Sequence, residues 1–256
     1  MNRTLLHILM GTLPIVGFAN GQAATVEADH RWEMRICAPP NTMPFSDVDE
    51  QGFENRIAHL LADEMNAHAE FEWVAFTEDM INLYFAEGTC DIIMGVPDGF
   101  ERGMTTLSYY RSPYSIVYRA DAGFDIDSMD DPDLADKVIG VQGLGTPPHV
   151  ALAKRGLSGN VARVYGGEEG VDDRLGTLVR AIESGEVEVG FGWGPVVSYF
   201  ADRSDVDLVV KPVSPEFEPP DIFQSLPMTI AVRRNDVALR DLLNVAIASR
   251  LAQSTM

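Results

Sequence analysis

The sequence lacks the motifs that would identify an enzyme directly. It contains no P-loop, no Gly-x-Ser-x-Gly elbow, no His-Glu-x-x-His helix and no Cys-x-x-Cys pair. Gly143 and Gly145 begin like a dinucleotide-binding fingerprint, but Thr146, Pro147 and Pro148 end the match. The five histidines are scattered, which favours solvated or core positions over metal ligation. We therefore expect a binding protein without a cofactor or a metal rather than an enzyme.

Basic residues are scarce. The chain has 19 Lys plus Arg against 39 Asp plus Glu, a formal charge of −20. This balance argues against nucleic acid or an anionic membrane as a partner, and it fits a basic partner or simply a surface adapted for solubility. Residues 121–136 hold seven Asp without the glycine and final Glu of a calcium-binding loop, so this segment is interpreted as a solvated connection.

No run after the first two dozen residues is apolar enough to cross a bilayer. Residues 1–24 carry Arg3, an apolar stretch over 5–18 and a small-residue region over 19–24, the pattern of a secretory signal peptide. Cleavage after Gly21, Ala23 or Ala24 fits equally well. The mature chain is thus expected to be exported and periplasmic, and not to span the membrane.

Cysteine is nearly absent. Cys37 follows the first predicted strand and Cys90 opens the third. An exported protein meets an oxidising compartment, and strands one and three are commonly neighbours in a parallel sheet, so a Cys37–Cys90 disulfide is plausible if the Cα atoms lie within about 7 Å. Two separate buried thiols are the alternative.

The sequence does contain a repeated pattern. Residues 92–96 form a short apolar run that stops at Pro97 and Gly99, as expected for a buried parallel strand that feeds a loop. Residues 183–195 repeat the pattern, and a helix-like segment precedes each copy. Two such copies predict two similar α/β lobes whose strand ends face a common cleft.

Element by element, the chain predicts one α/β unit, an extended crossover, a second α/β unit, an extended return and a closing helix. The expected strands are 31–37, 71–76, 91–96, 114–119, 138–142, 161–165, 187–191, 206–210 and 226–233, and the expected helices are 52–67, 78–86, 146–156, 172–184, 196–201 and one from 236 onward. Lobe 1 then comprises 25–118 plus 229–256, and lobe 2 comprises 119–228. The two crossovers, expected near 117–120 and 228–232, make a hinge.

The loops that follow the strands supply the candidate ligand cleft. They carry aromatic and polar side chains, together with a helix N-terminus at Thr146 that could receive a carbonyl oxygen or an anion. The candidate cleft residues are Asn41, Phe45, Asp98, Phe100, Arg102, Tyr109, Arg111, Gln142, Thr146, Trp193 and Gly194.

Eight short segments in order resemble the type II periplasmic solute-binding proteins of the polar-amino-acid class, and within it the members associated with quinoprotein dehydrogenases. The motifs are Ile36-Cys37-Ala38 with Pro44-Phe45-Ser46, Gly52-Phe53-Glu54-Asn55, Cys90-Asp91 with Met94-Gly95-Val96-Pro97, Tyr109-Tyr110-Arg111-Ser112, Thr146-Pro147-Pro148 and Trp193-Gly194-Pro195. The resemblance implies a non-enzymatic, monomeric protein of the two-lobed fold. It also implies that the protein helps to mature or activate a pyrroloquinoline-quinone-dependent alcohol dehydrogenase, such as methanol dehydrogenase.

The alternative is a receptor that delivers a small polar solute, such as an amino acid or an organic acid, to an ABC permease. Amino-acid receptors of this class place an arginine after the third strand, near Arg102 here, to hold the ligand carboxylate. They also place an acidic residue where this chain has Trp193, Gly194 and Pro195. The resemblance therefore implies an incomplete amino-acid site. An enzymatic function on this fold, such as a dehydratase, has no supporting constellation.

Overall fold

The computed structural model describes residues 31–75, 77, 79–165 and 175–254. The expected signal peptide and the first residues of the expected helix over 172–184 lie outside this part of the chain.

The described chain alternates strands and helices as expected for an α/β protein. Its strands are β1 (Trp32–Ala38), β2 (Asn41–Thr42), β3 (Ser46–Asp47), β4 (Ala67–Trp73), β5 (Ile92–Pro97), β6 (Met104–Thr105), β7 (Tyr110–Arg119), β8 (Ile139–Gln142), β9 (Val161–Tyr165), β10 (Val189–Trp193), β11 (Leu208–Pro212), β12 (Phe217–Glu218), β13 (Ile222–Phe223) and β14 (Ser225–Val232). Its helices are α1 (Phe53–Glu64), a π-helical segment η1 (Met80–Phe85), 3-10 turns η2 (Pro132–Asp136) and η3 (Leu157–Gly159), α2 (Pro147–Lys154), α3 (Thr177–Ser184), α4 (Gly194–Ala201) and α5 (Val237–Ser254).

Two predicted elements of lobe 1 differ from those in the structure. The strand expected over 71–76 is β4, which begins four residues earlier and pairs with β1 along its whole length, from Trp32 opposite Ala67 to Ala38 opposite Trp73. Because β4 ends the sheet, it alternates polar and apolar residues, and its first half did not show the apolar run of a central strand. The helix expected over 78–86 is reduced to the π-helical segment η1.

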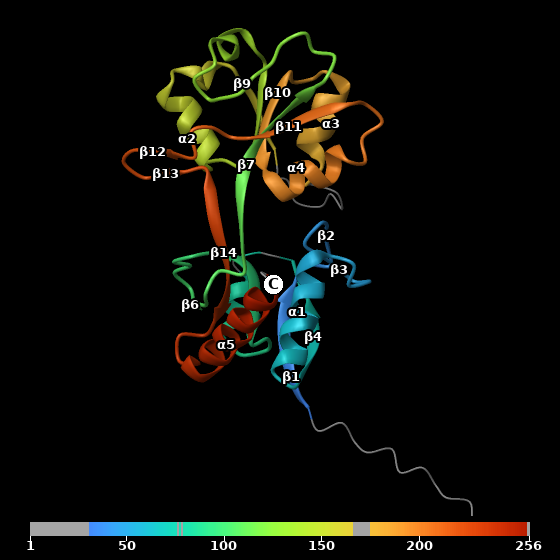
Figure 1. The fold of residues 1–256 in the computed structure, drawn as a ribbon, viewed down its shortest axis with the longest axis vertical. Helices are drawn as coiled ribbons and strands as arrows, with labels where there is room; N and C mark the ends of the chain where they lie inside the picture. Colours follow the sequence, from blue (N-terminus) through green and yellow to red (C-terminus); the bar gives the residue numbers. More distant parts are fainter. Residues whose placement is uncertain (1–30, 76, 78, 166–174, 255–256) are drawn as a thin grey trace, which may run out of the picture. The chain divides into compact units, whose positions relative to one another are not determined.

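One sheet runs through both lobes in the order β4-β1-β5-β14-β7-β10-β8-β9, with β6 on β14 and β11 on β7. The β4-β1-β5 side belongs to lobe 1 and the β10-β8-β9 side to lobe 2. Strands β7 and β14 connect them and pair with each other (Figure 1). The two-lobed α/β fold with two strand crossovers is therefore confirmed.

Both sides of the sheet are covered in each lobe. In lobe 1, α1 and α5 pack over one face through Leu61 and Leu243, while η1 covers the other through Met80 and Phe85. In lobe 2, the core on one face includes residues of α2, and α3 and α4 cover the other. This double covering explains why the central strands are continuous apolar runs, since both of their faces are buried.

The crossovers lie earlier in the two strands than the sequence indicated. Strand β7 pairs with β14 up to Pro113 and with β10 and β11 from Tyr114 onward. Strand β14 pairs with β7 from Ser225 to Met228 and then with β5. The expected crossovers at 117–120 and 228–232 are corrected accordingly, because Val117 and Tyr118 are interior residues of the lobe 2 sheet. The division of the chain into lobe 1 (25–118 plus 229–256) and lobe 2 (119–228) stays a proposal. The strand pairing favours a first boundary near Pro113 and Tyr114.

Candidate functional site

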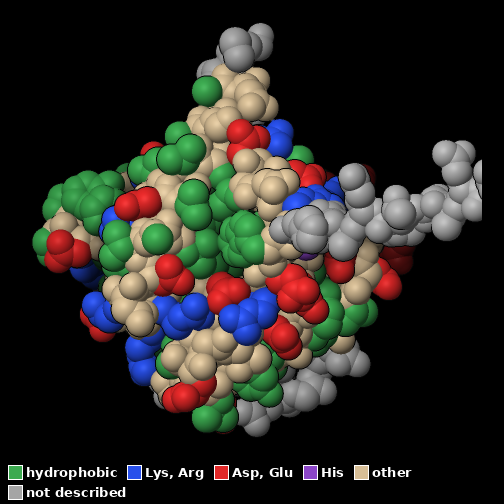
Figure 2. All heavy atoms as spheres, turned by 90° about the horizontal axis from the view of Figure 1, so that it is seen from below, with side chains coloured by type: hydrophobic (Ala, Val, Ile, Leu, Met, Phe, Trp, Pro, Cys, Tyr) green, Lys and Arg blue, Asp and Glu red, His purple; other side chains and the backbone are tan. Residues whose placement is uncertain are grey.

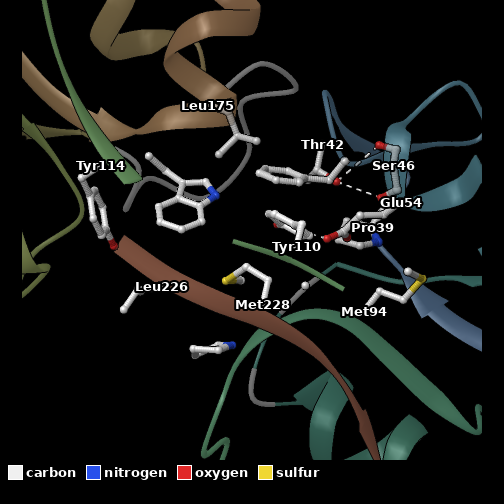
Figure 3. Close-up of a pocket in the computed structure, with 14 residues that line it drawn as sticks. Pro39, Thr42, Ser46, Glu54, Met94, Tyr110, Tyr114, Leu175, Leu226 and Met228 are labelled. Atoms are coloured by element: carbon white, nitrogen blue, oxygen red, sulfur yellow. Dashed lines mark hydrogen bonds between the residues drawn. The ribbon is translucent and has the colours of Figure 1, made fainter. Parts of the chain in front are cut away.

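A cavity of about 430 Å³ lies where the crossover strands meet the loops of the two lobes (Figure 3). Its walls are mostly aromatic and aliphatic. The aromatic residues are Phe45, Tyr110, Tyr114 and Trp193, and the aliphatic ones are Pro39, Met94, Pro97, Leu175, Leu226 and Met228. Thr42, Ser46, Glu54 and Gly95 complete the lining. An apolar concave site with few polar groups is typical of a small-molecule or side-chain pocket.

The loop after β1 is built onto the start of α1. The amide of Phe53 donates to the carbonyl oxygen of Pro44 (2.9 Å), and that of Glu54 donates to the carbonyl of Phe45 (3.0 Å). These bonds use amides at the helix N-terminus that have no partner within the helix. A Cβ on Gly52 would lie 1.9 Å from the carbonyl oxygen of Phe45, so only glycine permits this approach. The loop thereby carries Phe45 into the cavity wall.

Glu54 lies in the first turn of α1 and is 9% exposed. Its Oε1 accepts a hydrogen bond of 2.7 Å from the Tyr109 hydroxyl and a longer one of 3.5 Å from the Tyr110 hydroxyl. The Tyr109 hydroxyl in turn accepts from the amide of Gly95 (2.9 Å). Burial raises the pKa of Glu54 to about 7, and the two tyrosine hydrogen bonds act in the opposite direction.

Gly95 explains how a carboxyl group fits beside β5. A Cβ at this position would lie 2.6 Å from Glu54 Oε1, and its φ of +69° is one that side-chain-bearing residues rarely adopt. The bare backbone of Gly95 leaves room for the carboxyl group, and its amide hydrogen-bonds the tyrosine that donates to that group.

The aromatic rings form two groups, one in each lobe, that border the same cavity. Phe45 packs edge-on against Phe53 at 5.4 Å between ring centroids, and Phe53 packs against Tyr110 at 5.3 Å. In lobe 2, Trp193 packs against Tyr114 at 5.0 Å. Burial raises the pKa of Tyr114 to about 12, which keeps its hydroxyl neutral.

Of the eleven candidate cleft residues, Phe45 and Trp193 line this cavity. Two others lie directly behind it: Tyr109 through its bond to Glu54, and Gln142, whose Oε1 accepts from the amide of Trp193 at 2.9 Å. Gly194 faces a second, shallow hollow of about 360 Å³ beside β7 and α4, together with Ser112 and Ser115.

The other six candidates are not brought to the cavity, because each is engaged elsewhere or points away. Asp98 accepts from Thr105 Oγ1, Arg102 donates to Asn82, and Arg111 donates to the carbonyl oxygen of Ser225. Phe100 packs against the core around the disulfide, the Thr146 hydroxyl donates to the carbonyl oxygen of Gly143, and Asn41 is exposed. The expectation that Asp98 and Trp193 face one cleft is corrected, since Pro97 rather than Asp98 contributes to the lining.

The sequence interpretation missed Glu54, Tyr110 and Tyr114 as lining residues. Glu54 was noted as part of a motif and as the start of a helix, and Tyr114 as the start of an extended run. The available signal was an acidic residue in the first turn of α1, directly after an aromatic one, combined with a glycine inside the buried run of β5. A glycine there marks a close approach by another group.

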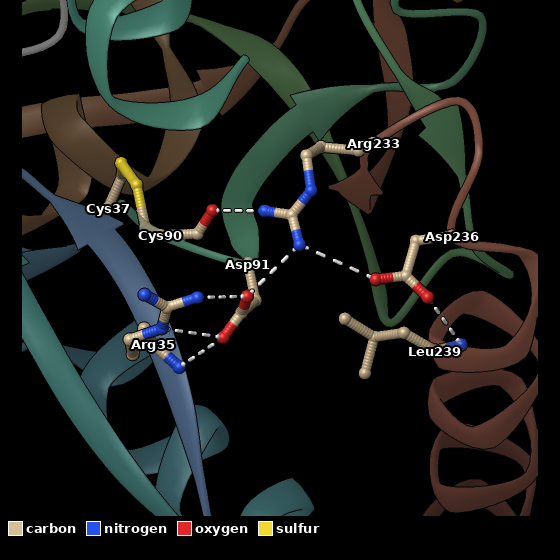
Figure 4. A network of polar contacts seen from close by, with 7 residues as sticks. All are labelled: Arg35, Cys37, Cys90, Asp91, Arg233, Asp236 and Leu239. Atoms are coloured by element: carbon tan, nitrogen blue, oxygen red, sulfur yellow. Dashed lines mark hydrogen bonds and ion pairs between the residues drawn. A yellow bond between two sulfur atoms is a disulfide. The ribbon is translucent and has the colours of Figure 1, made fainter. Parts of the chain in front are cut away.

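The Cys37–Cys90 disulfide is confirmed, with the two Cα atoms 5.5 Å apart (Figure 4). Beside it, Asp91 accepts from Arg35 Nε (3.1 Å), from Arg35 Nη2 (2.8 Å) and from Arg233 Nη2 (3.1 Å). These arginines lower the pKa of Asp91 despite its partial burial. The disulfide and this ion cluster together fix the start of β5 to β1 and to the end of β14.

A scan against protein-family models finds no match. A curated protein, MoxJ from Methylorubrum extorquens, is 29% identical over 241 residues, which cover 90% of this chain and 80% of MoxJ. Among solved structures, MxaJ from Methlophaga aminisulfidivorans MPT has a TM-score of 0.71 at 26% identity and covers 86% of this chain and 94% of its own. XoxJ from Methylobacterium extorquens AM1, described as a periplasmic binding protein, has a TM-score of 0.68 at 29% identity, with 86% and 92% covered.

The sheet order and these likenesses define the chain as a protein of the two-lobed periplasmic solute-binding fold. Within that class it is a solute-binding protein of the MoxJ type. An ancestral arginine-binding protein at 22% identity and an amino acid ABC transporter substrate-binding protein from Streptococcus pneumoniae at 18% identity share the fold alone. None of the helices in the described part of the chain is both long and apolar enough to cross a membrane.

Proposed function

We propose that this chain is a non-enzymatic periplasmic protein tied to methanol oxidation, which serves a pyrroloquinoline-quinone-dependent dehydrogenase as a maturation or activation partner. The likeness to MoxJ over 90% of the chain supports this assignment, as do the MxaJ and XoxJ structures.

The observation that carries the proposal is the chemistry of the cavity lining. An amino-acid receptor must hold a carboxylate, which needs a cation or several free hydrogen-bond donors. In the described part of the chain no Lys, Arg or His lines the cavity, and Arg102 and Arg111 are engaged outside it. The site therefore does not suit a free amino acid, and this favours an accessory role.

The surface outside the cleft supports a protein partner. On the hairpin β12–β13, the rings of Phe217 and Phe223 pack at a tilt with their centroids 4.7 Å apart, and the two residues are 44% and 51% exposed. The chain has a formal charge of −20, and Figure 2 shows acidic side chains interspersed with basic and hydrophobic ones on one face. A partner with basic groups around an apolar contact would complement such a surface, and salt would weaken the complex.

The alternative function, delivery of a small solute to an ABC permease, is favoured by one specific observation. The cavity lies against both crossover strands, through Tyr110, Tyr114 and Met228, where rotation of the lobes would close it on a ligand. The apolar lining restricts that solute to one with a large apolar part.

The test is capture from periplasmic extract of methanol-grown methylotroph cells. The mature chain is immobilised, and the bound fraction is analysed for quinone by absorbance and for dehydrogenase polypeptides by mass spectrometry. We expect a quinoprotein dehydrogenase at about 20 mM salt and clearly less of it at about 500 mM. A variant with Phe217→Ser and Phe223→Ser serves as the matched comparison for the exposed hairpin. Absence of any quinoprotein at low salt contradicts the proposal, and recovery of a permease complex supports the alternative.

A further inference from the structure

The described lining of the cavity contains one carboxyl group, which can carry a negative charge. Among the lining residues in the described part of the chain, Glu54 is the one acidic side chain, and its carboxyl group lies beside Tyr110 (Figure 3). The remaining polar lining groups are the hydroxyls of Thr42, Ser46 and the tyrosines. A ligand that enters the cavity therefore meets one group that can be anionic, among apolar groups and hydroxyls.

The two oxygens of that carboxyl group differ. Oε1 accepts the hydrogen bonds from Tyr109 and Tyr110. Within the described residues, Oε2 receives no hydrogen bond. A carboxylate oxygen without a donor in an apolar surrounding binds a cationic donor more strongly than it would in water, because water competes less and the local dielectric constant is low. A residue that lines the cavity thus has one carboxylate oxygen without a hydrogen-bond donor among the described residues.

The aromatic walls also favour a cationic ligand. The rings of Phe45, Tyr110, Tyr114 and Trp193 all border the cavity. Ring faces attract cations, with tryptophan the most effective, and several rings around a carboxylate are a common arrangement for substituted ammonium groups. An anionic ligand has no basic lining residue to meet in the described chain and would be repelled by Glu54.

We infer that the cleft binds an amine or guanidinium group on an apolar stem. The cation donates to Glu54 Oε2, and the stem lies between the aromatic walls. This inference deepens the proposed function and rests on it for the source of the ligand, which is then the basic side chain of a dehydrogenase segment. A free amine offers the same chemistry, and the experiment separates the two sources.

The experiment measures binding of paired probes that are similar in size but differ in charge. 2-Phenylethylamine and 3-phenylpropionate are titrated by calorimetry into the mature chain, and acetyl-Phe-Lys-amide is compared with acetyl-Phe-norleucine-amide in the same way. We expect each cationic probe to bind at least about tenfold more tightly than its uncharged or anionic counterpart. Binding of both cationic probes assigns a general amine site, and binding of the lysine peptide alone assigns a polypeptide source.

Two variants make the outcome specific to the carboxylate. Glu54→Gln keeps the size and the accepting oxygen but removes the charge, so it should reduce affinity for the cationic probe about tenfold and erase the preference over 3-phenylpropionate. Glu70→Gln, on the exposed edge strand β4, should change neither. Circular dichroism checks that both variants fold. Equal binding of the two charge types, an unchanged preference in Glu54→Gln, or no binding of any probe overturns the inference, whereas dehydrogenase capture can still succeed in each of these cases.

Discussion

Strands β5 and β10 have the same place in their respective lobes but are supported differently. Each lies inside the sheet and ends at the cavity, at Pro97 in one and Trp193 in the other. The start of β5 is held by a disulfide and by Asp91 with its two arginines. The corresponding acidic residue before β10, Glu188, is exposed and accepts one hydrogen bond, from the amide of Val138 (2.9 Å).

The glycines of β5 and β10 also differ in the groups that approach them. Gly95 in β5 gives room to the carboxyl group of Glu54. Gly190 and Gly192 in β10 give room to aliphatic groups, since a Cβ at these positions would lie 2.8 Å from Val117 and 2.6 Å from Val197. A repeated sequence pattern therefore produces a polar, strongly anchored cavity wall in lobe 1 and an apolar, packed wall in lobe 2. The one acidic side chain in the described lining of the cavity therefore lies on the lobe 1 side.

The largest expected effect comes from removing the covalent anchor of β5. Replacing both cysteines, Cys37→Ser with Cys90→Ser, should lower the free energy of unfolding by about 4 kcal/mol, since a loop closed across 53 positions restricts the unfolded chain strongly. Urea unfolding of the variant and the oxidised parent measures the difference. An unchanged midpoint would show that packing alone anchors β5, as it does β10.

Glu54 should make stability depend on pH. Its pKa is raised from an ordinary value of 4.5 to about 7 in the folded chain. The folded state therefore holds the proton more tightly, and the stability that this contributes is present below pH 4.5 and is lost as pH rises to about 7. Glu54→Gln removes this loss, so its stability relative to the parent should increase by about 3 kcal/mol over that range.

Unfolding of Glu54→Gln, Glu70→Gln and the parent at several pH values from 4.5 to 8 checks this prediction. The exposed Glu70 serves as the control for removal of a carboxyl group as such. A stability difference between Glu54→Gln and the parent that stays constant with pH would contradict the burial of a titrating carboxyl group in the lobe 1 wall.

Substitution of Asp91, before β5, and of Glu188, before β10, tests whether the two strands are anchored differently. Asp91→Asn leaves Arg35 and Arg233 without their shared carboxylate and should destabilise the fold by about 2 kcal/mol. Glu188→Gln keeps an acceptor for the amide of Val138 and should change stability by less than about 0.5 kcal/mol. Because the pKa of Asp91 is lowered by its arginines, the effect of Asp91→Asn should shrink as pH falls towards acid. Equal effects of the two substitutions would remove the distinction between the strands.

The smallest expected effect is the difference in stability between Gly95→Ala and Gly99→Ala. This difference separates steric crowding from backbone strain. Gly95→Ala adds a Cβ 2.6 Å from Glu54 Oε1 at a φ of +69°, whereas Gly99→Ala adds one at a φ of +81° with nothing within 4 Å. Both substitutions lower the free energy of unfolding because alanine disfavours a positive φ. The additional loss in Gly95→Ala, about 1 kcal/mol, therefore reports the crowding of the Glu54 carboxyl group. Thermal unfolding of the two variants measures it. A larger loss in Gly99→Ala would contradict the close approach.

Much of the fold was predictable because its strands are buried on both faces. The apolar runs of β5, β8 and β10 and the helical spacing of α1 and α5 all appear in the sequence. The edge strand β4 was misplaced because only its pairing with β1 defines its start. The crossovers were misplaced because β7 and β14 are continuous strands that change partner midway, and no local pattern marks that change.

The site was less predictable for a different reason. The strand-end loops point to the region of this cavity and include Phe45 and Trp193, but they do not show which side chains turn inward. Asp98 and Arg111 bind their own neighbours instead of the cavity. Glu54 reaches the cavity from a helix rather than from a loop, and only the spatial contact with Gly95 reveals its position. Periodicity reports burial of a helix face, whereas a cleft depends on contacts between distant segments.

The most direct measurement of the central claim is the activity of a quinoprotein methanol dehydrogenase per mole of dehydrogenase polypeptide. It is assayed in periplasm of cells that lack this chain, and again after the parent chain or Cys37→Ser with Cys90→Ser is supplied. We predict low specific activity without the chain, recovery with the parent, and weaker recovery with the variant that lacks the anchor of β5. Equal specific activity with and without the chain would contradict its role as a dehydrogenase partner.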